Sequence, residues 1–261
     1  MARIETALGA IGVAEAGAGG VPLVFLHGVG SDKSAWAGQV AHFGRSRRTI
    51  ALDYPGYGES DPASPGADAP HDRFAAVILA ALDALAVGRF HLCGLSLGGI
   101  VAIAIGHRAP ARTASLILAD TFAVHPDGTA IRDRSVAASS DMAVLARARV
   151  PALLAPDPEP QLAADLVAVM ARIEPAAFRL GSSAVWLAAQ RDRAAAIAAP
   201  TLVLCGAEDR VTPPALSDAL AALIPHAGRI DIPAAGHLPN LEQPAAFNAA
   251  LDAFLAVLAS A

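Results

Sequence analysis

Short apolar runs alternate with longer alanine-rich stretches along most of the chain. The apolar runs are rich in Val, Ile and Leu and span residues 21–26, 49–52, 90–93, 115–119, 201–205 and 229–232. Helical spacing of apolar residues is clear over 75–86, 163–171, 194–199 and 245–259. This alternation predicts an α/β fold, in which helices flank a mostly parallel sheet. Ahead of the first run, the glycine-interrupted stretch 4–13 predicts an antiparallel hairpin at one edge of that sheet.

The segment between residues 122 and 196 interrupts this alternation. It shows helical apolar spacing, no convincing strand, and prolines at 151, 156, 158, 160 and 175. A structureless connection of that length is rare inside a compact domain. We therefore expect a cap of several short helices, inserted after the strand that ends near Ala119, with a bend at Pro156–Pro160. The predicted organisation is a core domain of residues 1–121 and 197–261 and a helical cap of residues 122–196.

The composition is that of a globular chain with a large core. The protein has 261 residues, of which 54% are hydrophobic and 16% charged. That length supports a core without disulfide or metal staples, so no structural metal is expected. No apolar run reaches the roughly 18 residues of a membrane span. At the N-terminus, Glu5 precedes any apolar stretch, which is not typical of a secretory signal.

The charge and the cysteines limit the classes of binding partner that the protein is expected to have. The net charge is -5, and the tightest basic cluster is Arg45, Arg47 and Arg48, which is too small for a duplex-binding face. Cys93 and Cys205 lie inside apolar runs, as buried reduced cysteines do. We expect a cytoplasmic protein that binds neither nucleic acid nor membranes. The oligomeric state is not readable from the sequence.

The residues after the run 90–93 carry the clearest chemical signal. Gly94-Leu95-Ser96-Leu97-Gly98 stands between a predicted strand and a predicted helix. In a Gly-x-Ser-x-Gly turn of this kind, the glycines leave room for a tight bend that exposes the serine hydroxyl. The free N–H groups at the start of the helix favour developing negative charge. Ser96 is therefore the candidate nucleophile.

The loop after the first apolar run supplies a second element of the same chemistry. Acyl transfer needs two N–H donors aimed at the oxyanion, one after the nucleophile and one from this loop. Leu97 and Val29 are the candidate donors. His27 precedes Gly28 in this loop and is a candidate base, although a histidine before a glycine turn more often bonds the backbone.

The base and its carboxylate are expected at later strand ends. His237 follows the last apolar run and precedes the final predicted helix. Asp209 falls just beyond the run 201–205, and the order Ser96, Asp209, His237 is that of this type of catalytic triad. Asp120, after the run 115–119, is a second candidate for the acid. A serine nucleophile needs no metal or organic cofactor, so none is expected.

Taken together, these motifs resemble those of the α/β-hydrolase fold family. The resemblance extends from about residue 20 to the C-terminal end and includes the segments 53–60, 206–209 and 236–237. Within that family, the segments 93–99, 200–204 and 237–244 are most similar to the 3-oxoadipate enol-lactonases. Pro55 departs from this pattern, because those enzymes usually carry an arginine before Gly56. Leu238 departs from the ring-cleavage C–C hydrolases, which tend to have tryptophan there.

These observations predict a serine hydrolase that cleaves a small-molecule ester or lactone, with an enol-lactone of aromatic catabolism as the specific hypothesis. A broad carboxylesterase and a C–C bond hydrolase of ring-cleavage diketones are alternatives, as is a non-catalytic receptor on the same fold. Phe122 and Trp186 are the candidate substrate-binding residues of the cap. The cationic candidates for a substrate carboxylate are the cap arginines Arg132, Arg134, Arg179 and Arg191, among which the sequence does not choose.

Overall fold

A single eight-stranded sheet organises the protein in the computed structural model, which describes residues 2–63 and 69–259. The strand order across the sheet is β1-β2-β4-β3-β5-β6-β7-β8. The strands are β1 (Ala2–Ile4), β2 (Ile11–Ala16), β3 (Leu23–Leu26), β4 (Thr49–Leu52), β5 (Phe90–Leu95), β6 (Thr113–Ala119), β7 (Thr201–Gly206) and β8 (Gly228–Ile232). Each of the six apolar runs forms a strand, and the predicted edge hairpin is the β1–β2 pair.

The sheet is parallel from β4 to β8 and antiparallel at the β1–β2–β4 edge. Strands β3 to β7 are buried except at His91 of β5, which is half-buried. This burial explains why they are continuous apolar runs rather than alternating ones. Parallel strands end at one common edge. The residues that follow β3, β5, β6 and β7 are therefore brought together at that edge.

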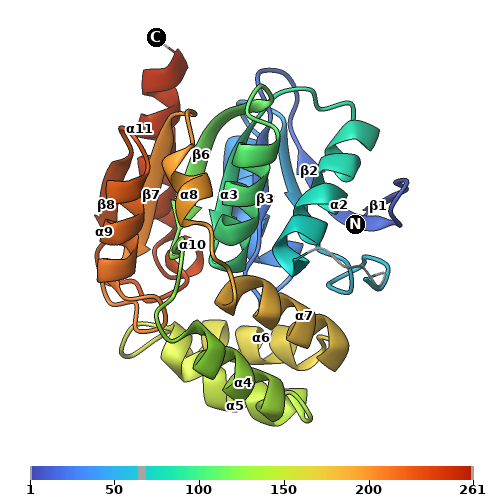
Figure 1. Ribbon diagram of the computed structural model, residues 1–261, viewed down its shortest axis with the longest axis vertical. Coiled ribbons are helices and arrows are strands. Elements are labelled where there is room, and N and C mark those ends of the chain that lie inside the picture. The colour runs from blue at the N-terminus through green and yellow to red at the C-terminus, as the bar shows by residue number, and fades with distance from the viewer. Residues whose placement is uncertain (1, 64–68, 260–261) are drawn as a thin grey trace.

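Helices cover both faces of the sheet (Figure 1). One face carries α2 (Pro70–Ala84), α3 (Leu97–Arg108), α8 (Arg191–Ala195) and α9 (Pro214–Leu223). The other carries α1 (Ala37–Phe43) and α11 (Pro244–Ala259), with the short helices η1 (Lys33–Trp36) and α10 (Pro239–Glu242) beside them. The helical stretch predicted over 194–199 is wrong from residue 196 onward, because α8 ends at Ala195. Pro200 and the start of β7 leave no room for another turn.

Four helices form a separate layer beyond the carboxyl edge of the sheet, at the bottom of Figure 1. They are α4 (Gly128–Ala138), α5 (Met142–Leu153), α6 (Pro160–Ala171) and α7 (Pro175–Trp186). The bend predicted at Pro156–Pro160 lies in the connection between α5 and α6. Pro151 does not divide the segment, because it lies inside the last turn of α5. This layer spans residues 128–186, inside the predicted cap segment 122–196, whereas α8, which also belongs to that segment, packs beside α3 and α9. The ends of the predicted core segments, residues 1 and 260–261, are outside the described residues.

None of the helices in the described part of the chain combines the length and the apolar character that a membrane crossing requires. Cys93 and Cys205 are both buried free thiols, as the sequence predicted.

Candidate active site

Ser96 occupies a strained turn between β5 and α3. Its backbone has φ +55° and ψ -112°, a region that costs a non-glycine residue conformational energy. A Cβ at Gly94 would collide with the carbonyl oxygen of Gly98, and a Cβ at Gly98 with that of Leu26. The two glycines are therefore required for β5, β3 and the start of α3 to approach this closely. The turn is fixed by hydrogen bonds from the Ser96 N–H to the Ala119 carbonyl (2.9 Å) and from the Thr121 hydroxyl to the Ser96 carbonyl (2.9 Å).

His237 and Asp209 form a buried pair at the ends of the last two strands. Their side chains are 4% and 0% exposed, and His237 Nδ1 lies 2.8 Å from Asp209 Oδ2. Because a carboxylate only accepts, Nδ1 carries the proton and Nε2 is left free as a base. This is the geometry that a catalytic histidine and its orienting acid require.

Asp209 is held ionised by its surroundings. Its other partners are the Thr212 hydroxyl (2.6 Å) and the N–H groups of Val211 (2.7 Å) and Thr212 (3.1 Å). Burial on its own would raise the pKa of Asp209, but His237 and these donors hold that pKa well below its usual range. The carboxylate therefore keeps its charge, and with it the orientation of the imidazole. The sequence analysis did not anticipate Thr212, whose place three residues after Asp209 is the only signal for it.

Ser96 and His237 line the same cavity, although they lie on loops 141 positions apart in the chain. The cavity contains about 500 Å³ of atom-free space, part of which is open to solvent. Its walls are largely apolar and its residues come from the loop after β3, from the cap helices α5 and α6, and from the loop after β8. They are His27, Gly28, Val29, Gly30, Ser31, Ala35, Trp36, Leu95, Ser96, Arg149, Leu153, Leu166, His237, Leu238, Asn240 and Leu241.

The candidate donors Val29 and Leu97 lie in the loop after β3 and at the first residue of α3. Across the described residues, neither N–H donates a hydrogen bond within the protein. Val29 also lines the cavity. Two free donors beside the candidate nucleophile Ser96, one of them at a helix N-terminus, would suit a developing oxyanion.

Asp120, the second candidate for the acid, is not bonded to His237. Its Oδ1 accepts a hydrogen bond from the Gly206 N–H at 2.8 Å. Burial and the neighbouring Asp209 charge raise the pKa of Asp120 well above its usual range, which disfavours the ionised form that an orienting acid needs. The structure brings His237 together with Asp209 instead.

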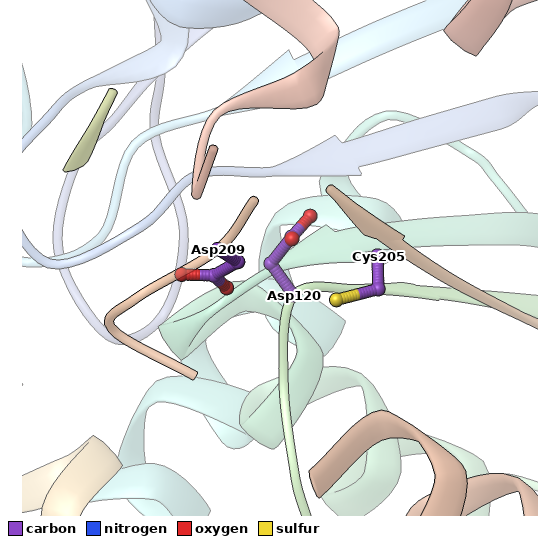
Figure 2. A group of neighbouring side chains, drawn as sticks. All are labelled: Asp120, Cys205 and Asp209. Carbon is purple, nitrogen blue, oxygen red and sulfur yellow. The ribbon is translucent and has the colours of Figure 1, made fainter. Parts of the chain in front are cut away.

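Asp120 lies between Asp209 and Cys205, as Figure 2 shows. One potential ligand atom from each of the three lies within 4.8 Å of the others. A cation would need deprotonated ligands. However, burial raises the pKa of both Asp120 and the Cys205 thiol, and both Asp209 oxygens already accept hydrogen bonds. The chemistry of this cluster does not suit a metal ion.

His27 lines the cavity but bonds the backbone. Its Nδ1 lies 2.8 Å from the Gly28 carbonyl oxygen, and its ring packs on Tyr54. Burial lowers the pKa of His27, which keeps the ring neutral. The residue therefore shapes the loop that carries Val29.

The predicted substrate-binding residues of the cap lie elsewhere. Phe122 and Trp186 are buried and stack on each other with ring centroids 5.8 Å apart, and His125 packs edge-on against both. Neither ring is among the described residues that line the Ser96 cavity. The aromatic cluster instead packs the base of the cap, where aromatic residues at helical spacing usually form core.

The loop that carries His237 is fixed by residues that the sequence analysis did not single out. Asn240 donates from Nδ2 to the Ala35 carbonyl (2.9 Å), and Gln39 donates from Nε2 to the Asn240 carbonyl (3.1 Å). These bonds tie the His237 loop to η1 and α1. Their partners are more than 200 residues apart, so no local pattern reveals them.

The fold and the site together define a hydrolase-type architecture, and comparison with known proteins agrees. A family model described as the alpha/beta hydrolase family matches residues 23–250, so the chain belongs to that family. The match covers every element of the candidate site, from the loop after β3 to the His237 loop.

Sequence identity to the enol-lactonases over nearly the whole chain is below 30%. The chain is 27% identical over 237 residues to 3-oxoadipate enol-lactonase 2 of Acinetobacter baylyi, covering 89% of this chain and 88% of that protein. The crystal structure of the enol-lactonase from Burkholderia xenovorans LB400 superposes with a TM-score of 0.90 at 26% identity, covering 98% and 100% of the two chains. A 43% identical match over 102 residues to the dihydrolipoyllysine-residue acetyltransferase component of the acetoin cleaving system of Pseudomonas putida spans only 27% of that protein. The resemblance to enol-lactonases is thus confirmed.

Proposed function

We propose that the protein is a serine hydrolase that cleaves a carboxylic ester or lactone through Ser96, His237 and Asp209. The observation that carries the proposal is the buried His237–Asp209 hydrogen bond beside a cavity that Ser96 also lines. A non-catalytic receptor would have no use for a charged, fully buried carboxylate held against a histidine, nor for the strained backbone at Ser96.

The proposed reaction assigns a defined role to each group, and His237 acts in turn as base and acid. His237 Nε2 removes the proton of the Ser96 hydroxyl, and Oγ attacks the carbonyl carbon to form a tetrahedral oxyanion. The N–H groups of Val29 and Leu97 hold that oxyanion. Collapse expels the alcohol oxygen, which takes the proton from His237, and leaves an acyl-enzyme. Water, deprotonated by His237, then hydrolyses the acyl-enzyme by the same route.

An enol-lactone is the specific substrate that we propose. The support is the similarity over nearly the whole chain to proteins named as enol-lactonases, together with the largely apolar wall of the Ser96 cavity. Carboxylesterase activity uses the same groups and remains the alternative. A panel of muconolactone-type enol-lactones, short esters and ring-cleavage diketones separates the three substrate classes by kcat/KM.

The test of the hydrolase proposal is p-nitrophenyl acetate hydrolysis by the wild type, Ser96→Ala and Ser34→Ala. Ser34 is exposed and is not among the residues that line the Ser96 cavity, so it serves as the matched serine control. We expect Ser96→Ala to lower kcat by at least about a thousandfold and Ser34→Ala to leave it unchanged. Equal, negligible rates for all three proteins would refute the proposal.

A further inference from the structure

Arg149 places a positive charge in the wall of the Ser96 cavity. It lies in the cap helix α5, and the cavity wall contains no other Lys or Arg and no Asp or Glu within the described residues. The side chains around the cavity on the cap side and near His237 are apolar, among them Leu153, Leu166 and Leu241. Arg149 is therefore the only fixed charge that a bound molecule would meet there apart from the catalytic pair.

The Arg149 guanidinium has no acidic partner. In the part of the chain that the structure describes, no ion pair or hydrogen bond involves this side chain, and its Nε is a buried donor without an acceptor. The ionisable group that acts on the pKa of Arg149 is Tyr57, whose hydroxyl donates to the Ala177 carbonyl at 3.0 Å and whose own pKa burial raises. A neutral phenol does not balance the charge.

The other cap arginines differ from Arg149. Arg132 pairs with Asp133 (3.0 Å), Arg179 is exposed and reaches Ser139, and Arg134 and Arg191 are exposed. Burial lowers the pKa of Arg149, but an arginine starts so high that it stays charged at neutral pH. Burying an unpaired charge costs free energy, which a ligand of opposite charge recovers.

We propose that Arg149 binds a carboxylate on the substrate, and that the preferred substrates are esters or lactones carrying one carboxylate away from the scissile bond. This proposal rests on the hydrolase function proposed above. A guanidinium matches a carboxylate with two parallel hydrogen bonds. A single cation in an apolar wall suits a monoanion better than a phosphate dianion, which would need a second cation. The sequence offered four other arginines as candidates, because the place of Arg149 in the cavity and its lack of an acidic partner are not visible in the sequence.

The kinetic test compares a charged and a neutral ester in two arginine variants. We measure kcat/KM for monomethyl glutarate and for methyl pentanoate in the wild type, Arg149→Met and Arg147→Met. Arg147 is exposed on the same helix and is the matched control. We expect the ratio of the two kcat/KM values, charged over neutral, to fall roughly 100-fold in Arg149→Met and to stay unchanged in Arg147→Met. An unchanged ratio in Arg149→Met overturns the proposal.

A binding test separates this proposal from the hydrolase function. We measure the Tm of Ser96→Ala and of the double variant Ser96→Ala, Arg149→Met with added monomethyl glutarate, which is a monoanion, and with added inorganic phosphate. A ligand that binds only the folded state raises Tm. We expect monomethyl glutarate to raise Tm more than phosphate does in Ser96→Ala, and to lose that effect in the double variant. Equal shifts in both proteins overturn the carboxylate site, whatever the hydrolysis assays show. Failure of p-nitrophenyl acetate hydrolysis alone would overturn only the hydrolase function.

Discussion

Glu242 accepts a 2.6 Å hydrogen bond from the backbone N–H of Ala155, which ties α10 to the chain that leaves the cap helix α5. The other Glu242 oxygen accepts from the N–H groups on both sides of His237, those of Gly236 (2.9 Å) and Leu238 (3.2 Å). The His237 N–H itself donates to the Leu153 carbonyl at 2.7 Å. One carboxylate thus fixes the candidate base against the cap.

Replacing Glu242 should misplace His237 without removing it. Glu242→Gln loses the charge and puts an NH₂ donor against N–H donors, so at least one of the three bonds fails. We expect kcat for p-nitrophenyl acetate to fall roughly tenfold, with a smaller change in KM, at temperatures far below the Tm of the variant. Glu208→Gln, at an exposed carboxylate on the neighbouring loop, is the control and should leave kcat unchanged. A loss that appears only near the Tm would show that Glu242 stabilises the fold and does not position His237.

Replacing each of the two buried aspartates by asparagine should affect kcat very differently. Asp209→Asn puts an amide beside His237 Nδ1 and favours the wrong tautomer, so we expect kcat to fall by roughly 10⁴. Asp120 makes no bond to His237, and Asn keeps the acceptor for the Gly206 N–H, so Asp120→Asn should keep kcat close to that of the wild type. Circular dichroism confirms that both variants fold. A large loss of kcat in Asp120→Asn with Asp209→Asn active would assign the acid to Asp120.

His91 should make the protein less stable in mild acid. Burial, with the nearby charges of Arg47 and Arg89, lowers the pKa of His91 from its usual 6.5 to about 4, and Nδ1 lies 2.8 Å from the Ser115 hydroxyl. Above pH 6.5 the ring is neutral in both the folded and the unfolded chain. As the pH falls from 6.5 to 4, the unfolded chain takes up the proton first, so the free energy of unfolding falls.

Urea unfolding between pH 7 and pH 4 measures this effect. In His91→Asn the fall of the free energy of unfolding over that range should be smaller, because the titrating group is gone. His107→Asn, at an exposed histidine, should follow the wild type. The same fall in wild type and His91→Asn would contradict the role of His91.

Most of the fold could be predicted because its central parallel strands, β3 to β7, are buried on both faces. Such strands appear as continuous apolar runs, and all six runs are strands in the sheet. The ends of elements were less predictable, since β5 continues through Gly94 to Leu95 and α8 stops at Ala195. Their ends depend on the tight approach of Gly94 to Gly98 and on the start of β7, which are contacts between elements.

The site was predictable where one residue type and a local turn define the chemistry. Ser96 and His237 have such turns, and both line one cavity. The remaining residues around the site are placed by packing contacts between segments that are far apart in the sequence. Lys33 is an example, since it is buried and bonds Asp53 through Nζ at 2.7 Å, yet nothing in its local sequence distinguishes it from a surface lysine. Arg149 could not be predicted for the same reason. Phe122 and Trp186 are residue types that often line pockets, but here they pack as part of a core.

Covalent labelling of Ser96 tests the central claim most directly. An alkyl fluorophosphonate phosphonylates a serine hydroxyl that a neighbouring base activates, with release of fluoride, and the added mass is located by peptide mass spectrometry. We predict a single adduct on the peptide containing Ser96 in the wild type, no adduct in Ser96→Ala, and much slower labelling in His237→Ala. A wild-type protein that is not labelled at Ser96, or equal labelling of Ser96→Ala, would contradict the account.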